Sequence, residues 1–409
     1  MTTTTTPPRV TIVGAGLAGA RLAARLGSGA TLIGDEPHPP YNRVLLTDVL
    51  AGRYAPEVIA LPPPPGAYHR ARAVEIDRAA RVVRCADGTR VPYETLVLAT
   101  GANPVLPPLR GLFAPGAAEE LPRAVHAFRT MDDCLALARA ARPGTRAVVI
   151  GGGLLGVCAA RALADRGARV VLAQQGDRLM ERQLDPAAAE LVRLHLTGLG
   201  VEVHTECRVT GVRQADGAVR AVHLADGYVL AAELTVLACG VRPRTGLARA
   251  AGLDVRRGVV VDDQLRTSDP RIRAIGDCAE HAGTTACLAA PALDQADALA
   301  AALLPRGPAP PYTGTRSLTR LTLPHAHHPL DVAAFGEAEA RPDDDVIRLA
   351  DATRGTYRKV VVRGDRIVGG VLLGELAAVG ALARAWESDE PLPADGAPPL
   401  HLLTHDGGH

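Results

Sequence analysis

The sequence has no excess of charge and no long apolar run, and both absences exclude partners. Its 409 residues carry 45 basic and 44 acidic side chains, a formal net charge of +1, which does not indicate nucleic acid or an anionic membrane as a partner. No apolar stretch approaches the roughly 20 residues that a membrane-spanning helix needs. The stretch MTTTTTPPRV lacks the basic start, apolar segment and cleavage site of a secretory signal.

The cysteines show no pattern of a disulfide framework or of a metal site. There are seven, an odd number, and none is spaced as CxxC or CxxxxC, so we expect a reducing, cytoplasmic location and no metal. The histidines His325, His327 and His328 have no neighbouring carboxylate before Asp331, and we interpret them as part of a solvated loop. With 47% apolar residues, the chain can bury the cores of two or three domains.

A glycine-rich turn follows the first apolar strand, residues 10–13. Gly14, Gly16 and Gly19 have the GxGxxG spacing. In such a turn the first glycine makes a tight bend, the second lets the backbone approach a pyrophosphate, and the third lets a helix lie close to the strand. The spacing therefore predicts a dinucleotide-binding corner.

The segments after this turn support the same prediction. A helix that begins near Leu17 would direct free backbone N–H groups at phosphates. A second strand ends at Asp35 and Glu36, about 20 residues on, where a carboxylate can accept a hydrogen bond from a ribose 2′-OH. The residues expected to bind the dinucleotide are Gly14, Gly16, Leu17, Ala18, Gly19, Asp35 and Glu36.

The same corner occurs a second time, after a strand at residues 147–150. Its second strand, residues 169–173, is followed by Gln174 where an acid is expected, so a strong acceptor for a 2′-OH and a repulsive charge for a 2′-phosphate are both missing. Arg178 is near enough in sequence to meet such a phosphate, and the choice between NADH and NADPH stays open. The residues expected to bind here are Gly151, Gly153, Leu154, Leu155, Gly156 and Gln174.

Three more segments accompany the two corners. The strand in ETLVLATGANP ends at Thr100 and Gly101, and the similar ELTVLACGVRP contains Gly240. In LRTSDPRIRAIGDCAEH a strand ends at Gly276 and Asp277, and a carboxylate there can hold a sugar or polyol hydroxyl.

Taken in order, these five motifs resemble those of the FAD-dependent pyridine nucleotide oxidoreductases that have two dinucleotide-binding domains. The resemblance implies that the first corner holds the ADP moiety of FAD and that the second holds NADH or NADPH. It also implies that Asp277 binds the ribityl chain of FAD and that a helix starting near Pro291 directs its N-terminus at the flavin. The further cofactor-binding residues that it implies are Ala73, Ala99, Thr100, Gly101, Gly240, Gly276, Asp277 and Pro291.

The segment PHPPYNRVLLTDVLAG, residues 37–52, indicates which branch of this family the sequence resembles. It has no cysteine, which disfavours the disulfide reductase, NADH peroxidase and coenzyme A-disulfide reductase branches. It resembles ferredoxin and rubredoxin reductases, and most closely the FAD-containing N-terminal part of assimilatory nitrite reductase large subunits. The resemblance directs Arg43 towards the FAD pyrophosphate. Residues 178–185 and 290–303 resemble the same branch.

Three departures from that branch matter, and a fourth residue, Cys158, departs from the wider family. The cysteine-rich iron–sulfur and sirohaem regions of the nitrite reductases do not follow, so this chain is not expected to reduce nitrite by itself. Residues 60–77 look shorter than in the family, which bears on the contacts of the FAD adenine near Ala73. Asp48 stands where ferredoxin reductases often carry a lysine, and Cys158 stands where the family often has glutamate. We interpret Cys158 as a small buried helix residue.

The expected fold is α/β, with two Rossmann-like domains, the second inserted into the first, and a small α+β C-terminal domain. The expected bounds are 1–115 and 245–308 for the FAD domain, 116–244 for the NAD(P)H domain and 312–409 for the C-terminal domain. DG turns at Asp87 and Asp226 predict hairpins.

The function predicted is electron transfer from NAD(P)H through FAD to a separate redox partner. That partner would be a ferredoxin- or rubredoxin-like protein or a nitrite or nitrate reductase component, and a homodimer is compatible with this reading. Two alternatives remain open: an NAD(P)H oxidase or quinone reductase, and a non-catalytic flavin-binding protein. No catalytic side chain is predicted, because hydride transfer needs no protein acid or base.

Overall fold

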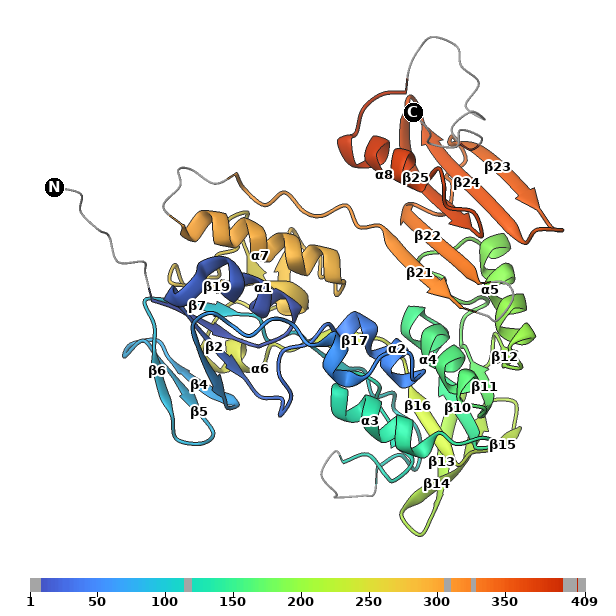
Figure 1. The fold of residues 1–409 in the computed structure, drawn as a ribbon, viewed down its shortest axis with the longest axis horizontal. Coiled ribbons are helices and arrows are strands. Elements are labelled where there is room, and N and C mark those ends of the chain that lie inside the picture. The colour runs from blue at the N-terminus through green and yellow to red at the C-terminus, as the bar shows by residue number, and fades with distance from the viewer. Residues whose placement is uncertain (1–8, 114–119, 305–309, 325–328, 393–402, 404–409) are drawn as a thin grey trace.

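Two parallel sheets of similar design dominate the molecule (Figure 1). The computed structural model describes residues 9–113, 120–304, 310–324 and 329–392, with Leu403, so the predicted histidine loop lies outside the described residues. The first sheet has the order β19-β7-β1-β2-β3. Its strands are β1 Val10–Val13, β2 Ala30–Gly34, β3 Ala67–Arg70, β7 Thr95–Leu98 and β19 Ile272–Ala274.

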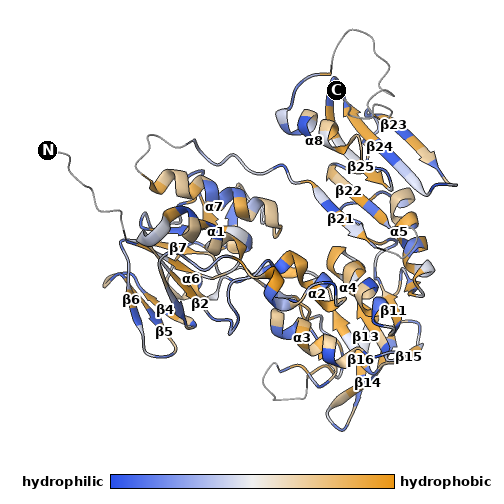
Figure 2. Ribbon diagram, in the orientation of Figure 1, coloured by the Kyte–Doolittle hydropathy of each residue, from blue (hydrophilic) through white to orange (hydrophobic). Residues whose placement is uncertain are grey.

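Two helices cover the first sheet, α1 (Leu17–Leu26) and α7 (Ala289–Leu303). They pack against each other, and Asp297 of α7 accepts hydrogen bonds from Arg21 and Arg25 of α1. All four residues of β1 are buried, as expected for a parallel strand that is covered on both faces. Figure 2 shows the same feature as apolar strands beneath helices with mixed surfaces.

The second sheet has the order β12-β11-β10-β16-β9. Its strands are β9 Val125–His126, β10 Arg146–Ile150, β11 Arg169–Ala173, β12 Glu202–His204 and β16 Leu234–Leu237, and its helices are α3 Met131–Ala140, α4 Leu154–Asp165 and α5 Pro186–Gly198. Local signals set the helix starts. Thr130 and Asp133 form a capping box at α3, and the Asp185 side chain accepts from the Ala188 N–H at the start of α5.

An antiparallel three-stranded sheet is attached to each parallel sheet. Both DG turns lie in tight hairpins of these sheets, between β5 and β6 and between β14 and β15, as the sequence predicts. The strands are β4 Ala73–Asp77, β5 Val82–Cys85 and β6 Arg90–Pro92 in one, and β13 Val209–Ala215, β14 Ala218–Leu224 and β15 Val229–Ala231 in the other.

The chain crosses between the two halves on a pair of short strands. These are β8 (Ala102–Pro104) and β17 (Val241–Pro243), which pair antiparallel. Arg244, directly after β17, donates to the side chain of Asn103 at 2.8 Å. The remaining short elements are η1 Gly27–Gly29, η2 Arg43–Leu45, α2 Leu46–Leu50, η3 Pro56–Ile59, α6 Gly246–Ala250, β18 Val259–Val261, η4 Gly276–Cys278 and β20 Ala279–His281.

A third, antiparallel sheet follows, with the order β21-β22-β25-β24-β23. Its strands are β21 Thr319–Leu323, β22 Leu330–Gly336, β23 Asp345–Asp351, β24 Thr356–Arg363 and β25 Arg366–Leu373, and α8 Val379–Ser388 packs on one face. Val332 and Val371 join the same buried cluster as Ala189 and Val192 of α5. This sheet therefore shares a core with the second parallel domain, and the expected fold class is confirmed.

A buried ion pair strengthens that contact. Lys359 of β24, the one lysine in the sequence, donates to the Asp185 carboxylate at 2.8 Å, and the Tyr357 hydroxyl donates to the same oxygen at 2.6 Å. Burial alone would raise the pKa of Asp185, but these hydrogen bonds and the one from Ala188 hold it below its usual value. Asp185 is thus a buried carboxylate with partners on both of its oxygens.

Candidate functional site

In the first glycine turn, the first and last glycines have close backbone contacts and the middle glycine faces open space. Gly14 has a φ of +115°, and a Cβ built on it would lie 2.1 Å from the Ala99 carbonyl oxygen. A Cβ on Gly19 would lie 1.9 Å from the Gly14 oxygen, whereas one on Gly16 would meet nothing within 4 Å. Leu17 and Ala18 begin α1, which has no side-chain cap. Free N–H groups and open space at Gly16 suit a phosphate.

The second turn repeats these contacts closely. Gly151 has a φ of +108°, and its Cβ would lie 2.5 Å from the Ala238 oxygen; a Cβ on Gly156 would lie 1.8 Å from the Gly151 oxygen. A Cβ on Gly153 would again meet nothing within 4 Å. Leu154 and Leu155 form the first turn of α4, which also lacks a side-chain cap.

The ATG and ACG segments support these turns. Ala99 follows β7 and Ala238 follows β16, so each backbone oxygen closes the space beside the first glycine of its turn. Gly101 and Gly240 have positive φ values of 72° and 96°, and each precedes one of the crossing strands, β8 or β17. Thr100 donates to the Arg244 carbonyl oxygen at 2.7 Å. The two segments thus connect the glycine turns to the crossover.

The carboxyl edge of the first sheet carries a connected set of charges. Glu36 accepts from Arg43 at 2.6 Å and from the Tyr41 hydroxyl at 2.5 Å. Burial raises the pKa of Tyr41, so this phenol stays protonated and donates. Asp35 lies 3.4 Å from the Arg244 guanidinium. Both predicted acids therefore lie beside the first glycine turn.

Arg129 extends this set and was not predicted from the sequence. Its guanidinium pairs with Asp277 at 2.5 Å, and its carbonyl oxygen accepts from Arg43 at 2.7 Å. Its Nε is buried and has no partner among the described residues, so a donor is left for a ligand. One feature of the sequence could have pointed to Arg129. It directly precedes the Thr130 capping box, which fixes the Arg129 backbone at the start of α3.

Three other predicted residues lie on the same side of the first domain. The Gly276 N–H donates to Gln295 of α7 at 2.7 Å, which ties the Asp277 turn to that helix. Helix α7 begins at Ala289, and Pro291 is buried in its first turn. Ala73 begins β4 just after β3, whose Arg70 pairs with Gly34 of β2. The shorter segment 60–77 thus still supplies a parallel strand beside β2.

The two unusual side chains near the second corner form no redox site. Cys158 is buried, and burial raises its pKa to about 12, so the thiol stays protonated. Asp48 pairs with Arg161 of α4 at 3.5 Å and with Arg53 at 3.7 Å. Asp48 therefore acts as a link between α2 and α4.

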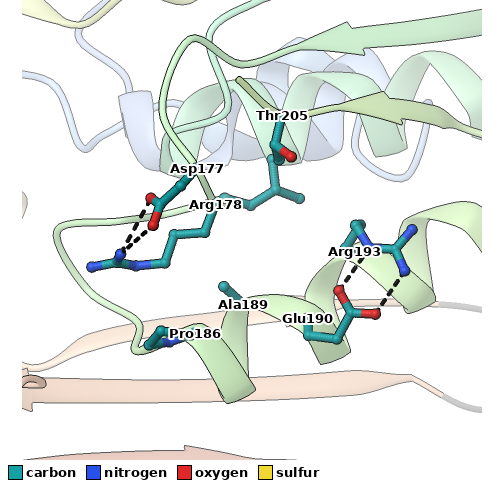
Figure 3. Close-up of a pocket in the computed structure, with 8 residues that line it drawn as sticks. Asp177, Arg178, Pro186, Ala189, Glu190, Arg193 and Thr205 are labelled. Atoms are coloured by element: carbon teal, nitrogen blue, oxygen red, sulfur yellow. Dashed lines mark hydrogen bonds and ion pairs between the residues drawn. The ribbon is translucent and has the colours of Figure 1, made fainter. Parts of the chain in front are cut away.

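At the edge of the second corner, Gln174 and Arg178 are bonded to other groups of the protein. The Gln174 Oε1 accepts from the Gly152 N–H at 2.7 Å. Arg178 pairs with Asp177 at 3.0 Å and also with Glu339, in the loop after β22. Figure 3 shows Arg178 turned to Asp177 beside a pocket whose other lining includes Thr205, Glu190 and Arg193.

Within the described ranges, no three histidine, cysteine or acidic side chains gather closely enough to bind a metal ion. In the same ranges, no helix has the length and hydrophobicity to cross a membrane.

Known proteins match this arrangement over nearly all of the chain. Residues 8–296 match the model for "Pyridine nucleotide-disulphide oxidoreductase", and residues 329–390 match the "Rubredoxin NAD+ reductase C-terminal domain". The chain belongs to the pyridine nucleotide-disulphide oxidoreductase family. Members of this family bind FAD and use NAD(P)H, which confirms the cofactors expected from the sequence.

Individual relatives within the family are named reductases. The chain is 34% identical over 387 residues to nitrite reductase [NAD(P)H] of Bacillus subtilis, covering 90% of this chain and 46% of that protein. It is 36% identical over 284 residues to rubredoxin-NAD(+) reductase of Pseudomonas putida, covering 66% and 71%. The chain spans about half the length of the nitrite reductase that it matches.

A solved structure shows the same architecture. The ferredoxin reductase from Rhodopseudomonas palustris is 28% identical, with a TM-score of 0.82 over 97% of this chain and 98% of that one. The resemblance to this family, drawn from the motifs alone, is thereby confirmed.

The residues present fit FAD at the first corner. Gly16 leaves open the space that a pyrophosphate needs, and the Arg129 Nε leaves a buried donor without a partner. Asp277 and Glu36 supply carboxylates for hydroxyl groups at either end of the same edge.

Proposed function

We propose that this chain is an electron-transfer reductase that takes electrons from NAD(P)H through FAD to a separate redox protein. The observation that carries the proposal is the pair of glycine turns, each with its second glycine open and its helix uncapped. One turn would hold the resident dinucleotide and the other would admit the reducing one. When bound, FAD supplies acceptance of a hydride at N5 and release of electrons one at a time.

The side chains have separable roles in this proposal. Gly14, Gly16 and Gly19 form the pyrophosphate turn, with Leu17 and Ala18 presenting helix N–H groups. Glu36 would accept from the adenosine ribose, and Arg43, which pairs with Glu36, would lie towards the pyrophosphate.

Asp277 would orient the ribityl chain, and Arg129 would hold that carboxylate in place. The α7 terminus that contains Pro291 would stabilise negative charge on the reduced flavin. Gly151, Gly153 and Gly156 would hold the phosphates of NAD(P)H. The proposal assigns no proton transfer to any side chain.

The electron acceptor is proposed to be a separate protein. The described cysteines form no pair: Cys134, Cys158 and Cys278 are buried, and residues 37–52 contain none, so a relay through a cysteine pair is not supported. Relatives are named for rubredoxin and for nitrite reduction, which favours a small iron–sulfur protein or a nitrite or nitrate reductase component. A cytoplasmic location and a homodimer stay predictions.

The test uses purified full-length protein. We expect a yellow flavin spectrum that NADH or NADPH bleaches without oxygen, and reoxidation that accelerates when a rubredoxin or ferredoxin is added. Absence of flavin, or flavin that neither nicotinamide bleaches, would contradict the proposal. Peroxide release unaffected by any carrier protein would instead favour the oxidase alternative. Tight FAD binding without nicotinamide affinity would favour a non-catalytic protein.

A further inference from the structure

The second corner has no acid at residues 174 to 176, whereas the first corner has Asp35 and Glu36, yet a carboxylate reaches this place from another segment. We propose that Glu181 binds the ribose 2′-OH of the nicotinamide nucleotide and makes this chain selective for NADH over NADPH. The proposal rests on the proposed function in one respect, because it takes the second glycine turn as the nicotinamide nucleotide site.

The strand register identifies the place. Val13, before the first turn, pairs with Ile33, and Ile150, before the second turn, pairs with Ala173. Three residues beyond these partners lie Glu36 in the first corner and Gly176 in the second. Gly176 is therefore the counterpart of the carboxylate that serves the first corner, and it has no side chain.

Glu181 occupies the space that a side chain at residue 176 would fill. A Cβ built on Gly176 would lie 2.2 Å from the Glu181 Oε2. The backbone holds Glu181 there, because the preceding Met180 N–H donates to the Gly152 carbonyl oxygen at 2.8 Å. The backbone at Glu181 is thus tied to the phosphate turn, and its exposed carboxylate lies beside that turn, where a ligand hydroxyl can reach it.

Gln174 adds a donor next to this acceptor. Its Oε1 is engaged by the Gly152 N–H, so the amide NH₂ must point the other way, and its Nε2 lies 2.8 Å from the same built Cβ on Gly176. A ribose hydroxyl can donate to the Glu181 carboxylate and accept from the Gln174 amide. A 2′-phosphate has no proton to donate at neutral pH and would be repelled by the carboxylate.

The nearby Arg178 is directed elsewhere. Arg178 is paired with Asp177 (Figure 3). It is also paired with Glu339, and its Nε donates to the Leu184 carbonyl oxygen at 3.2 Å. These contacts hold the Arg178 guanidinium away from the space beside Gly176, so it is not placed to neutralise a 2′-phosphate there.

The experiment measures binding of two redox-inert fragments to the FAD-loaded protein by calorimetry. We expect ADP-ribose to bind about 30-fold more tightly than its 2′-phosphorylated form, the range of a hydrogen bond to a charged group. Glu181→Gln should reduce this ratio by about tenfold, and the ratio of NADH to NADPH rates in anaerobic flavin reduction should fall in parallel. Glu387→Gln, which changes an exposed acid of α8 in the C-terminal part of the chain, is the matched control. Flavin content and melting temperature establish that each variant is folded.

The outcomes separate the two proposals. Equal binding of both fragments to the wild-type protein, or an unchanged ratio in Glu181→Gln, overturns the role of Glu181. The role of Glu181 is also overturned if Arg178→Ala selectively loses binding of the phosphorylated fragment, because Arg178 would then be the residue that binds the 2′-phosphate. If neither fragment binds, the second turn is not a nicotinamide nucleotide site, and the proposed function fails with it. No electron acceptor is needed for any of these measurements.

Discussion

The two glycine corners have nearly the same backbone but different neighbours. In each, the first and third glycines are forced by contacts near 2 Å and the second is open. Around the first corner, Glu36, Arg43, Arg129 and Asp277 form one connected chain of charges. Around the second, Gln174 bonds to the turn itself and Arg178 is paired away from it. Two turns with the same backbone thus differ in the side chains brought to them, and the different roles proposed for the two corners rest on this difference.

The corners also differ in what is attached to them. The C-terminal part of the chain contacts the second domain through the buried pair of Lys359 and the α5 N-cap Asp185, and through Glu339, in the loop after β22, and Arg178. The loop that carries Glu181 thus lies between a glycine turn and the C-terminal part of the chain. That loop is fixed from both sides, whereas the charges at the first corner all come from the crossover and the first two domains.

The largest effect is expected from substituting the first glycine of each turn. Gly14→Ala forces a Cβ to within 2.1 Å of a carbonyl oxygen at a φ of +115°, at a cost of about 3 to 5 kcal/mol. We expect protein without flavin and a large drop in melting temperature. Gly151→Ala should keep its flavin but lose bleaching by NADH. Loss of flavin from both variants to the same degree would contradict the division of labour between the corners.

The next effect concerns the attachment that only the second corner has. Lys359→Met leaves the Asp185 carboxylate buried without its cation, which should lower the free energy of unfolding by about 3 kcal/mol. Urea unfolding of the wild-type protein and of the variant measures this difference in the free energy of unfolding. The double variant Asp185→Asn with Lys359→Met should recover part of the loss, since no buried charge remains. No recovery would mean that packing, not charge, holds the sheet.

A smaller effect tests the charges of the first corner. Arg129→Gln removes the partner of Asp277 and should weaken FAD binding by about tenfold, the cost of one charge-assisted hydrogen bond. Titration of apoprotein with FAD, followed by flavin fluorescence, gives the dissociation constant. Arg139→Gln, on the exposed side of α3, should leave it unchanged. Equal effects from the two variants would argue against a role for Arg129 at the flavin.

The smallest effect is one of pH. Hydrogen bonds from Arg21 and Arg25 lower the pKa of Asp297 to about 2 from 3.8. Because the folded-state pKa is depressed, this pair stabilises the first domain above about pH 4 and its contribution is lost as the pH falls from 4 towards 2. Asp297 is about one-third exposed, so the contribution is below about 1 kcal/mol. Asp297→Asn should make the free energy of unfolding less dependent on pH between about pH 4 and pH 2. An unchanged acid profile would mean that the pair does not stabilise the domain.

The sequence predicts the backbone of both corners well because glycine spacing and strand periodicity are local. It does not predict Arg129 or Glu181, since each reaches the corner from a different segment, and their places depend on how loops fold back. The loop with Glu181 returns because Met180 bonds to Gly152, a contact with no sequence signature. The pairing that holds Arg178 is likewise invisible in the local sequence, because its partner Glu339 is 161 residues away.

The buried Lys359 has a practical consequence. It is the one lysine of the sequence and its side chain is 6% exposed, so amine-directed cross-linkers find no lysine on the folded surface with which to capture an electron acceptor. Carboxylate- or arginine-directed chemistry offers many exposed side chains with which to trap such a complex. Conversely, any labelling of Lys359 reports that the C-terminal sheet has separated from α5, which makes this residue an internal probe of domain opening.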